Sequence, residues 1–282
     1  MKAERLVVFD YSGTLSLGSV RFAAPGTLMK ELEESGLAAL GVETVAFFWR
    51  EIVAPTWEEG SRTKAGYARM IEKRLGELCP GRERTDGETA RAAARFVGSY
   101  LRHSAPDPRW EPLLRELLSR EGTRVVIATD HYGEATAAIL RHLGNLALPA
   151  RAAADAPGEG PEPGIVVANS ADLGHPKGDR RFWEILKRKE RLETVRRTLC
   201  VDDFGGNEGE DDRYGVPEKV KKREEQTRRV LEAAFPGDVR ILPFLLPSGD
   251  PSVPRFADGH EEDPRGGPIL SAVKQVEDWL AE

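Results

Sequence analysis

Short apolar runs without polar alternation recur along the chain and predict buried strands. Four runs stand out, of which the last is weaker because Pro243 interrupts it: residues 6–9, 124–128, 198–201 and 239–244. Runs of Val, Ile and Leu are typical of parallel strands that are covered on both faces. Helical patterns accompany them at residues 110–119, 133–143, 180–191 and 217–234. The alternation of strand and helix predicts an α/β fold with a doubly wound, Rossmann-like parallel sheet.

The stretch between the first two predicted strands follows a different pattern. Residues 22–103 contain no convincing strand, whereas apolar residues recur there with helical spacing, at 26–35, 67–78 and 88–101. We therefore predict an α/β core domain formed by residues 1–20 and 105–282. Residues 21–104 are predicted to form an all-helical domain inserted after the first strand.

Three other segments complete the predicted organisation. Residues 156–164 and 247–268 are rich in Pro and Gly and are expected to be surface loops. Residues 269–280 show the spacing of a closing amphipathic helix. The acidic block and mixed basic helix at 206–230 resemble a docking element, but a solvated helix face with intrahelical charge pairs is the simpler interpretation.

Composition narrows the class of protein without identifying it. With 282 residues, of which 40% are hydrophobic, the chain can build one sizeable core that carries a smaller inserted domain. The 47 acidic residues outnumber the 41 basic ones, and the net charge of −6 provides no general attraction to nucleic acid or to membrane surfaces. We expect neither as a partner. The oligomeric state cannot be predicted from these features.

The compartment is predicted from the cysteines and the N-terminal residues. Cys79 and Cys200 are far apart and have no metal-ligand spacing, so neither a disulfide framework nor a zinc site is indicated. The apolar run in MKAERLVVFD is shorter than a signal-peptide core, and no stretch approaches the roughly 18 apolar residues of a membrane span. We therefore expect a cytoplasmic protein.

Carboxylates and a hydroxyl follow three of the predicted strands. Asp10 comes directly after the first, Thr129 and Asp130 end the second, and the third ends in the pair Asp202 and Asp203. The carboxyl ends of parallel strands meet at one edge of a sheet, where ligands bind. Gathering these groups at one edge is costly unless a cation or an anionic substrate lies there.

Four motifs in order resemble those of the haloacid dehalogenase superfamily. FDYSGTLS is similar to the first motif, in which an aspartate begins a turn that contains Gly and Thr, and RVVIATD resembles the second, which ends in Thr129. ADLGHPKGDRRFWEIL is similar to the third, with Lys177 ahead of a helix, and LCVDDFGGNE resembles the fourth, an acidic pair after a strand. The motifs span roughly 200 residues, and four in order are far more specific than any one of them.

The resemblance implies Mg²⁺-dependent hydrolysis of a small phosphorylated substrate. Asp10 would attack the phosphoryl group and form an aspartyl-phosphate. Mg²⁺ would be held by Asp10, by the backbone carbonyl of Ser12 and by Asp202 or Asp203. The groups implied to bind phosphate are the Thr129 hydroxyl, the Lys177 ammonium, Asp130 at the same strand end and the amide groups that the Gly13 turn exposes.

Ser12 departs from the pattern of the superfamily's phosphatases. Many of them carry at this position a second aspartate, which protonates the leaving oxygen, and losing such a group commonly costs about 10²- to 10⁴-fold in rate. Branches with another residue there include phosphonate hydrolases, for which Lys64 or Lys73 would have to supply a Schiff-base amine, and metal-independent dehalogenases. The acidic pair favours a metal site over the dehalogenase alternative. A non-catalytic protein that binds a phosphorylated ligand or partner is a further alternative.

The helical insertion would act as a cap that selects substrates and excludes water. Within PTWEEGSRTKAGY, the side chains of Arg62 and Lys64 are candidate anion ligands. Trp57 and Tyr67 in the same stretch are more often core aromatics than ligand contacts. His131 could replace the missing acid, although a surface histidine at a helix start is the simpler interpretation. Asn207 takes the place of a second acidic residue in the fourth motif and is expected to orient Asp203 or to bind metal through water.

Overall fold

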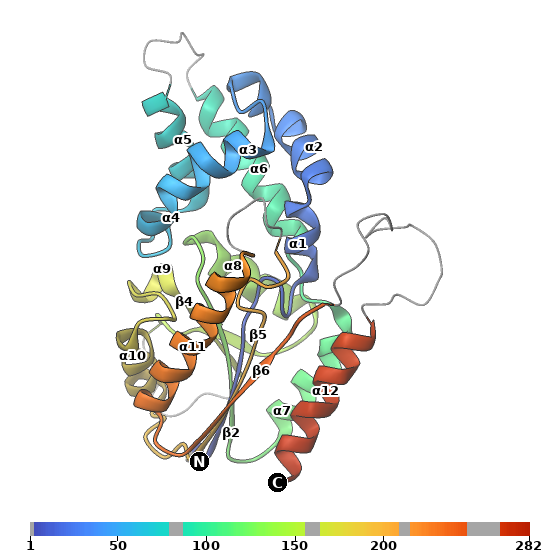
Figure 1. Cartoon of the computed structure of the whole chain (residues 1–282), viewed down its shortest axis with the longest axis vertical. Coiled ribbons are helices and arrows are strands. Elements are labelled where there is room, and N and C mark those ends of the chain that lie inside the picture. The colour runs from blue at the N-terminus through green and yellow to red at the C-terminus, as the bar shows by residue number, and fades with distance from the viewer. Residues whose placement is uncertain (1–2, 79–86, 156–163, 209–214, 247–265) are drawn as a thin grey trace.

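The computed structural model describes residues 3–78, 87–155, 164–208, 215–246 and 266–282. Six strands form one sheet in which all neighbours are parallel, in the order β3-β4-β2-β1-β5-β6. The strands are β1 Arg5–Phe9, β2 Thr123–Thr129, β3 Ala150–Ala152, β4 Ile165–Asn169, β5 Arg197–Asp202 and β6 Asp238–Pro243. Because the chain places β2 on one side of β1 and β5 on the other, a crevice is expected beyond the carboxyl ends of these three strands (Figure 1).

Helices cover both faces of the sheet, which explains the unbroken apolar run of β1. Val7 and Phe9 belong to a buried cluster with α7 (Glu111–Ser119), α8 (Glu134–Asn145) and α12 (Gly266–Ala281). Leu6 and Val8 point to the opposite face, toward α10 (Arg180–Glu190) and α11 (Pro217–Ala234). A short helix, α9 (Ser170–Leu173), follows β4. Successive strand residues alternate between the faces, so a strand covered on both sides needs apolar residues throughout.

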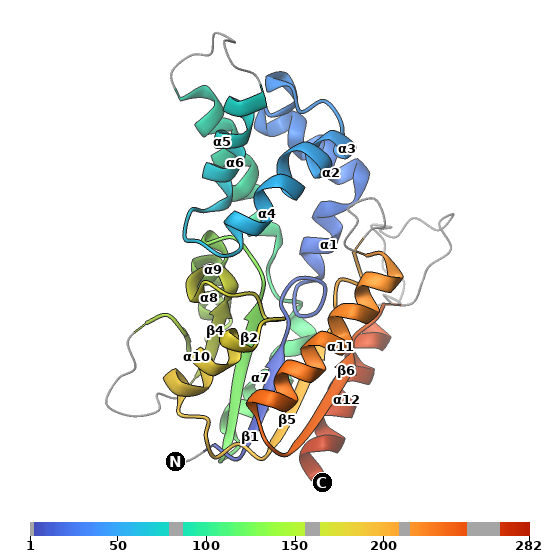
Figure 2. The ribbon, with the colours of Figure 1, turned by 60° about the vertical axis from the view of Figure 1, so that its left-hand side comes forward.

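Between β1 and α7 the described chain forms helices joined by turns and contributes no strand to the sheet, and we call its described residues from 17 to 110 the helical segment. Its helices are α1 Leu17–Ala23, α2 Pro25–Ser35, α3 Val45–Phe47, a π-helix Phe48–Val53, α4 Ala54–Gly60, α5 Tyr67–Leu78 and α6 Glu88–His103, with 3-10 turns at Ala38–Leu40 and Pro108–Trp110. Figures 1 and 2 show these helices gathered beyond the carboxyl ends of the strands. Their apolar side chains form a third buried cluster, apart from the two that flank the sheet.

The segment that follows β2 joins these helices to the sheet. The Glu134 carboxylate at the start of α8 accepts hydrogen bonds from the backbone N–H groups of Tyr67, at 2.5 Å, and Ala68, at 3.1 Å. These groups begin α5, where free N–H groups and the helix dipole favour a negative charge. The hydroxyls of Thr56 and Tyr132 lie 3.1 Å apart. The helical segment is therefore held by polar contacts directly beside the strand ends.

The predicted fold class is confirmed at the level of an α/β fold with a parallel sheet. The four predicted strands correspond to β1, β2, β5 and β6. The prediction missed β4, whose sequence IVVAN is a buried apolar run as clear as the others, and β3, whose three residues are too few to form a pattern. The division into a core domain and an inserted helical domain stays a prediction.

The predicted helices are present, but others were missed. The prediction omitted α1, α3, the π-helix, α4 and α9. Pro55 is the second residue of α4, which follows the π-helix without a break in helical conformation. Most of the two predicted Pro- and Gly-rich loops and the centre of the acidic block lie outside the described residues.

The charged helix and the membrane prediction are both addressed by the described residues. Glu224 and Glu225 on α11 form ion pairs with Arg228 and Arg229, one turn further along, which supports the interpretation of a solvated helix face. Among the described parts of the chain, no helix combines the length and the apolar character needed to cross a membrane.

Candidate active site

Asp10 lies at the point where β1 gives way to a tight turn. The Gly13 N–H donates to the Ser16 carbonyl at 3.0 Å, and the Ser16 N–H donates to the Tyr11 carbonyl at 2.8 Å. Gly13 has φ +81°, and a Cβ placed on it would lie 2.3 Å from Asp203 Oδ2. Only glycine therefore allows the turn to fold this closely against the carboxylate of the neighbouring strand.

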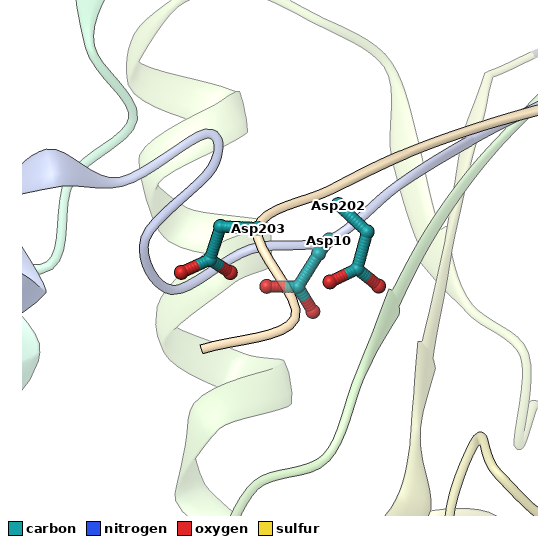
Figure 3. Close-up of side chains that lie close together, drawn as sticks. All are labelled: Asp10, Asp202 and Asp203. Carbon is teal, nitrogen blue, oxygen red and sulfur yellow. The ribbon is translucent and has the colours of Figure 1, made fainter. Parts of the chain in front are cut away.

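Three carboxylates gather around one lysine at the strand ends. Carboxylate oxygens of Asp10, Asp202 and Asp203 all lie within 4.8 Å of one another (Figure 3). The Lys177 ammonium donates to Asp10 Oδ1 at 2.5 Å and to Asp202 Oδ2 at 2.8 Å. All four side chains are buried. We call this group of four residues the carboxylate floor.

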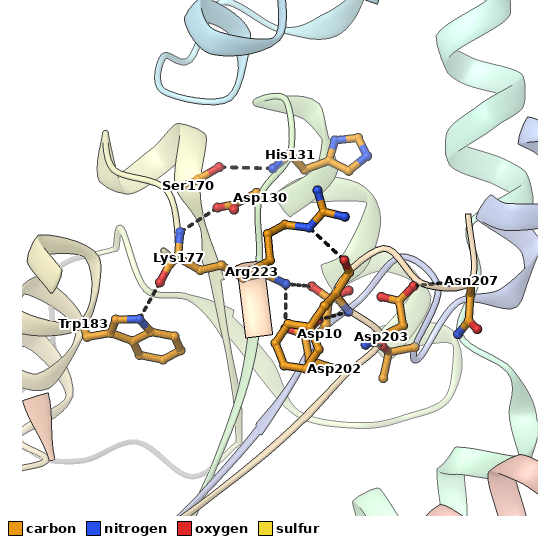
Figure 4. A network of polar contacts seen from close by, with 12 residues as sticks. Asp10, Asp130, His131, Ser170, Lys177, Trp183, Asp202, Asp203, Asn207 and Arg223 are labelled. Atoms are coloured by element: carbon orange, nitrogen blue, oxygen red, sulfur yellow. Dashed lines mark hydrogen bonds and ion pairs between the residues drawn. The ribbon is translucent and has the colours of Figure 1, made fainter. Parts of the chain in front are cut away.

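Two contacts fix the backbone of Lys177 (Figure 4). Its N–H donates to Asp130 Oδ1 at 2.7 Å, and its carbonyl accepts from the Trp183 indole N–H at 2.7 Å. Asp130 follows β2 and Trp183 lies on α10, so two separate elements position one lysine. The ammonium group of Lys177 is thereby directed at the carboxylates of Asp10 and Asp202 without the help of a ligand.

Burial and mutual repulsion act together on the carboxylates. Burial raises the pKa of Asp10 well above its usual range, and the neighbouring Asp202 and Asp203 add to the effect while Lys177 opposes it. Burial, reinforced by Asp202, raises the pKa of Asp203 to about 7. One ammonium cannot balance three buried carboxylates, and the arrangement favours a further cation at the floor.

The two adjacent aspartates have different hydrogen-bond partners. Asp202 accepts from Lys177 through Oδ2 and from the Phe204 N–H through Oδ1, at 2.7 Å. Asp203 accepts the Asn207 N–H through Oδ2 at 3.1 Å. Lys177 therefore holds Asp202 in place, whereas Asp203 lies beside the Gly13 turn and lines the cavity, where a metal ion could reach it.

Asn207 acts on the site mainly through the backbone around it. Its side-chain amide donates to the carbonyls of Gly13, at 2.8 Å, and Phe244, at 2.9 Å. Its own N–H contacts Asp203, as the prediction that it orients this residue requires. The amide therefore joins three loops that come from β1, β5 and β6.

The floor opens into a cavity of about 610 Å³ that separates the sheet from the helical segment. Asp10, Ser12, Thr129, Asp130, Lys177 and Asp203 line one end of it. The other end is lined by six rings of the helical segment, which we call the aromatic roof: Phe22, Phe48, Trp49, Trp57, Tyr67 and Phe96. A site of this size lies within the range of small-molecule sites, about 300 to 1,000 Å³.

The predicted anion ligands of the helical segment are placed elsewhere. Arg62 and Lys64 are exposed and are not among the residues that line the cavity, and Arg62 forms an ion pair with Glu58 at 3.1 Å. Trp57 and Tyr67 from the same stretch do line it. The stretch does reach the cavity, but through its two aromatic side chains and not through its two cations.

The interpretation of His131 as a surface residue is wrong. His131 is buried, lines the cavity and lies 2.9 Å from the Tyr100 hydroxyl through Nε2. Burial lowers its pKa to about 4, so the ring is neutral at physiological pH. The loop between β2 and α8 turns inward here because the helical segment covers it, which the sequence around Asp130 does not reveal.

Ser12 brings a buried hydroxyl to the cavity. Its Oγ forms no hydrogen bond with any residue that the structure describes. Tyr100 lies near it: burial raises the pKa of Tyr100 to about 12, and an interaction with Ser12 acts in the opposite direction. Two hydroxyls therefore occupy the place where an acidic side chain was expected.

Some residues that shape the site escaped the sequence analysis. Thr14 accepts the Asp203 N–H at 3.1 Å through Oγ1, and Ser170 accepts the His131 N–H at 3.1 Å through its hydroxyl. Thr14 was visible as the Thr of the first motif, but no role was assigned to it. Ser170 follows β4, so recognising that strand would have drawn attention to it.

Comparisons with known proteins add no identification. No protein-family model, curated protein or solved structure matches the chain. The resemblance to the haloacid dehalogenase superfamily thus depends on the four sequence motifs. What the site does must be inferred from its own chemistry.

Proposed function

We propose that the protein is a Mg²⁺-dependent hydrolase that removes a phosphoryl group from a small organic substrate through Asp10. The observation that carries the proposal is the buried carboxylate floor, three aspartates around one lysine, at the end of a cavity of about 610 Å³. Buried carboxylates in excess of their counter-charges are a common signature of a functional site.

The chemistry of the donor set fits Mg²⁺. The floor offers hard carboxylate oxygens without sulfur or imidazole, and burial raises the pKa of Asp10 and Asp203, which a cation would reverse. Asp10, Asp203 and the backbone carbonyl of Ser12 would hold the ion, with Asp202 engaged by Lys177. When bound, the ion supplies positive charge that offsets repulsion between a carboxylate and a phosphate dianion.

Asp10 has the environment of a nucleophile. A carboxylate oxygen of Asp10 attacks phosphorus, the bond from phosphorus to the leaving oxygen breaks, and water later hydrolyses the aspartyl-phosphate. Lys177 lies 2.5 Å from Asp10 Oδ1, where it orients the carboxylate and opposes the rise in its pKa that burial causes. The Thr129 hydroxyl, at the end of β2, lines the cavity and would bind a phosphoryl oxygen, whereas the Gly13 N–H, which was also expected to do so, is already engaged by the Ser16 carbonyl.

The helical segment would serve as the cap that closes the site. It supplies the aromatic roof, and a water-poor cavity strengthens each electrostatic interaction at the floor. Asp130 acts indirectly, because its carboxylate accepts the Lys177 N–H and thereby positions the lysine.

The presence of Ser12, where an acidic residue was expected, favours a second candidate function. The protein would bind a phosphorylated ligand without hydrolysing it. A serine hydroxyl cannot serve as a general acid at neutral pH. A metal-independent dehalogenase is less well supported, because such a reaction has no need of the three clustered carboxylates.

The direct test is phosphate release from 4-nitrophenyl phosphate with and without Mg²⁺, in the wild-type protein and in Asp10→Asn. Release that needs both Mg²⁺ and Asp10 is expected. Incorporation of ¹⁸O from water into the phosphate separates hydrolysis from binding alone. A different result would favour the non-catalytic candidate. Beryllium fluoride would then raise the melting temperature of the wild-type protein but not of Asp10→Asn, and no phosphate ester would release phosphate.

A further inference from the structure

The aromatic roof is a fixed surface and not a loose collection of side chains. Phe96 lies at the centre of several edge-to-face contacts, with ring centroids 5.5 Å from Phe22 and 5.1 Å from Phe48. Tyr67 stacks on Tyr132, which belongs to the segment after β2, at 4.1 Å and 6°. Rings that hold one another in this way present a preorganised apolar wall.

Charged groups are confined to the periphery of the roof. Within the described part of the helical segment, Arg50 is the charged side chain that lines the cavity, and it is exposed and paired with Glu51 at 2.7 Å. Glu208, after β5, and Lys219, on α11, line the cavity from outside the helical segment. The Ser19 hydroxyl, a polar group of the same wall, already donates to the Ser16 carbonyl at 2.7 Å. The six rings of the roof carry three polar groups, the Tyr67 hydroxyl and the indole N–H groups of Trp49 and Trp57, so a second ionised group would lose its water at this wall with few partners to gain.

We propose that the substrate is a phosphate monoester of an uncharged, mainly aromatic alcohol, with its ring against the aromatic roof and its phosphate at the carboxylate floor. This inference rests on the proposed function, because it assigns the organic part of the same substrate. The cavity volume of about 610 Å³ accommodates a fused ring together with the phosphate.

The test compares two esters whose leaving alcohols have similar acidity. With Mg²⁺, kcat/KM is expected to be about 100-fold higher for 2-(1-naphthyl)ethyl phosphate than for glycerol 1-phosphate, roughly the ratio that burial of the ring's apolar surface supplies. Equal kcat/KM for the two esters would overturn the substrate class and leave the proposed function intact.

A substitution that fills the cavity locates the ring. Ala54 lines the cavity from the start of α4, and Ala54→Leu is expected to lower kcat/KM for the naphthyl ester about 10-fold with little effect on glycerol 1-phosphate. Ala94→Leu is the matched control, since Ala94 is exposed on α6 and does not line the cavity. Equal losses on both esters in Ala54→Leu would contradict the assignment.

A binding measurement keeps the inference testable if no ester is hydrolysed. The non-hydrolysable 2-(1-naphthyl)ethyl phosphonate is titrated into Asp10→Asn by calorimetry, beside ethyl phosphonate. Tighter binding of the naphthyl compound that Ala54→Leu removes would support the assignment even though the proposed turnover had failed. Equal affinities of the two phosphonates would overturn it.

A separate observation concerns the hydrogen that Tyr100 can donate. The Tyr132 N–H donates to His131 Nδ1 at 2.8 Å, so this nitrogen carries the lone pair and the neutral ring carries its hydrogen on Nε2. His131 Nε2 must then donate to the Tyr100 oxygen, 2.9 Å away. Because the Tyr100 oxygen accepts the hydrogen bond from His131, the hydroxyl hydrogen of Tyr100 points away from His131. Ser12, which also lines the cavity, is a neighbour of this hydroxyl.

From this geometry we infer that the Tyr100 hydroxyl donates a hydrogen bond to the leaving oxygen, in the place where Ser12 provides no acid. The hydrogen bond stabilises charge as the bond from phosphorus to that oxygen breaks, and the alcohol takes its proton from water. His131 is a positioning residue, because it fixes the hydroxyl and does not contact the substrate. This inference also rests on the proposed function.

Leaving groups of different acidity test the role of Tyr100. Tyr100→Phe keeps the ring, and kcat is expected to fall about 100-fold for an alkyl phosphate but only a few-fold for 4-nitrophenyl phosphate, whose leaving group needs little assistance. Tyr67→Phe is the comparison, since it removes another hydroxyl from the same cavity, and any loss of kcat that it causes is expected to be equal for the two esters. An equal fall in kcat for both esters in Tyr100→Phe would overturn the assignment, whereas lack of any wild-type turnover would instead count against the proposed function.

Discussion

The carboxylate floor and the aromatic roof line the same cavity, but different interactions hold them in place. At the floor, short directional contacts fix each polar side chain, among them the bonds from Lys177 to Asp10 and Asp202. At the roof, rings such as Phe22 and Phe96 pack edge to face. The floor is costly to assemble without a ligand, because like charges are buried together, whereas the roof is stable by itself. The floor is therefore suited to chemistry and the roof to selection.

The largest expected effect is the loss of chemistry at the floor in Asp10→Asn. The amide keeps the size of the side chain but cannot attack phosphorus, so phosphate release is expected to fall by about 10⁴-fold or more. The melting temperature is expected to stay the same or rise, because one of three buried carboxylates is removed. Residual release within about tenfold of the wild type would show that Asp10 is not the nucleophile.

In contrast to Asp10→Asn, the substitution Phe96→Ala at the roof is expected to lower the stability of the protein. Phe96 is buried among rings of the helical segment, and truncating such a side chain typically costs about 3 to 5 kcal/mol. Denaturant unfolding should show a similar cost at pH 5 and pH 8, since no ionisable group is involved. If the loss in the free energy of unfolding varied strongly with pH, the stability of the roof would depend on ionisable groups, as that of the floor does.

Lys177→Met tests the opposite case, a floor variant whose cost depends on pH. Removing the cation leaves buried carboxylates uncompensated, which typically costs about 3 to 5 kcal/mol. The cost is expected at pH 8, where the carboxylates are ionised, and should shrink toward pH 5 as they take up protons. Lys187→Met on α10 is the control, because Lys187 is half-buried against Ala234 and lies away from the floor.

The metal-free protein should lose stability as pH rises, and Mg²⁺ should restore it. Burial raises the pKa of Asp203 from 3.8 to about 7, so between these pH values the folded state binds more protons than the unfolded state. The free energy of unfolding is therefore highest below pH 4 for this group and falls through pH 7, by up to about 4 kcal/mol. Unfolding midpoints at pH 5 and pH 8 measure the slope, and Asp203→Asn should flatten it. A metal-free protein equally stable at both values would contradict the assigned cause.

The smallest effect is expected from Arg62→Ala. This side chain is exposed, pairs with Glu58 and does not line the cavity, so its removal should change kcat/KM by less than about twofold. Lys64→Ala should behave in the same way. A tenfold loss in either variant would mean that the helical segment closes differently around the substrate and brings a cation to the floor.

The floor could be predicted because its residues follow strands directly. In a parallel sheet, the register of each strand decides which residue emerges at the carboxyl edge, so Asp10, Thr129 and Asp202 were placed together from the apolar runs that precede them. Lys177 depended on motif resemblance, because it lies in a loop after α9 and not at a strand end. His131 was misjudged for a related reason, since its burial depends on a covering segment that is distant in sequence.

The sequence by itself determined the parallel α/β sheet, the helical segment after β1 and the identity of the polar residues at the strand ends. Only the tertiary structure decided that Trp57 and Tyr67 face the cavity while Arg62 and Lys64 face solvent, and that Tyr100 meets His131 beside Ser12. Apolar periodicity fixes which side of a helix is buried, but not what lies opposite that side. Contacts between distant helices depend on how whole surfaces pack, and no local pattern encodes that packing.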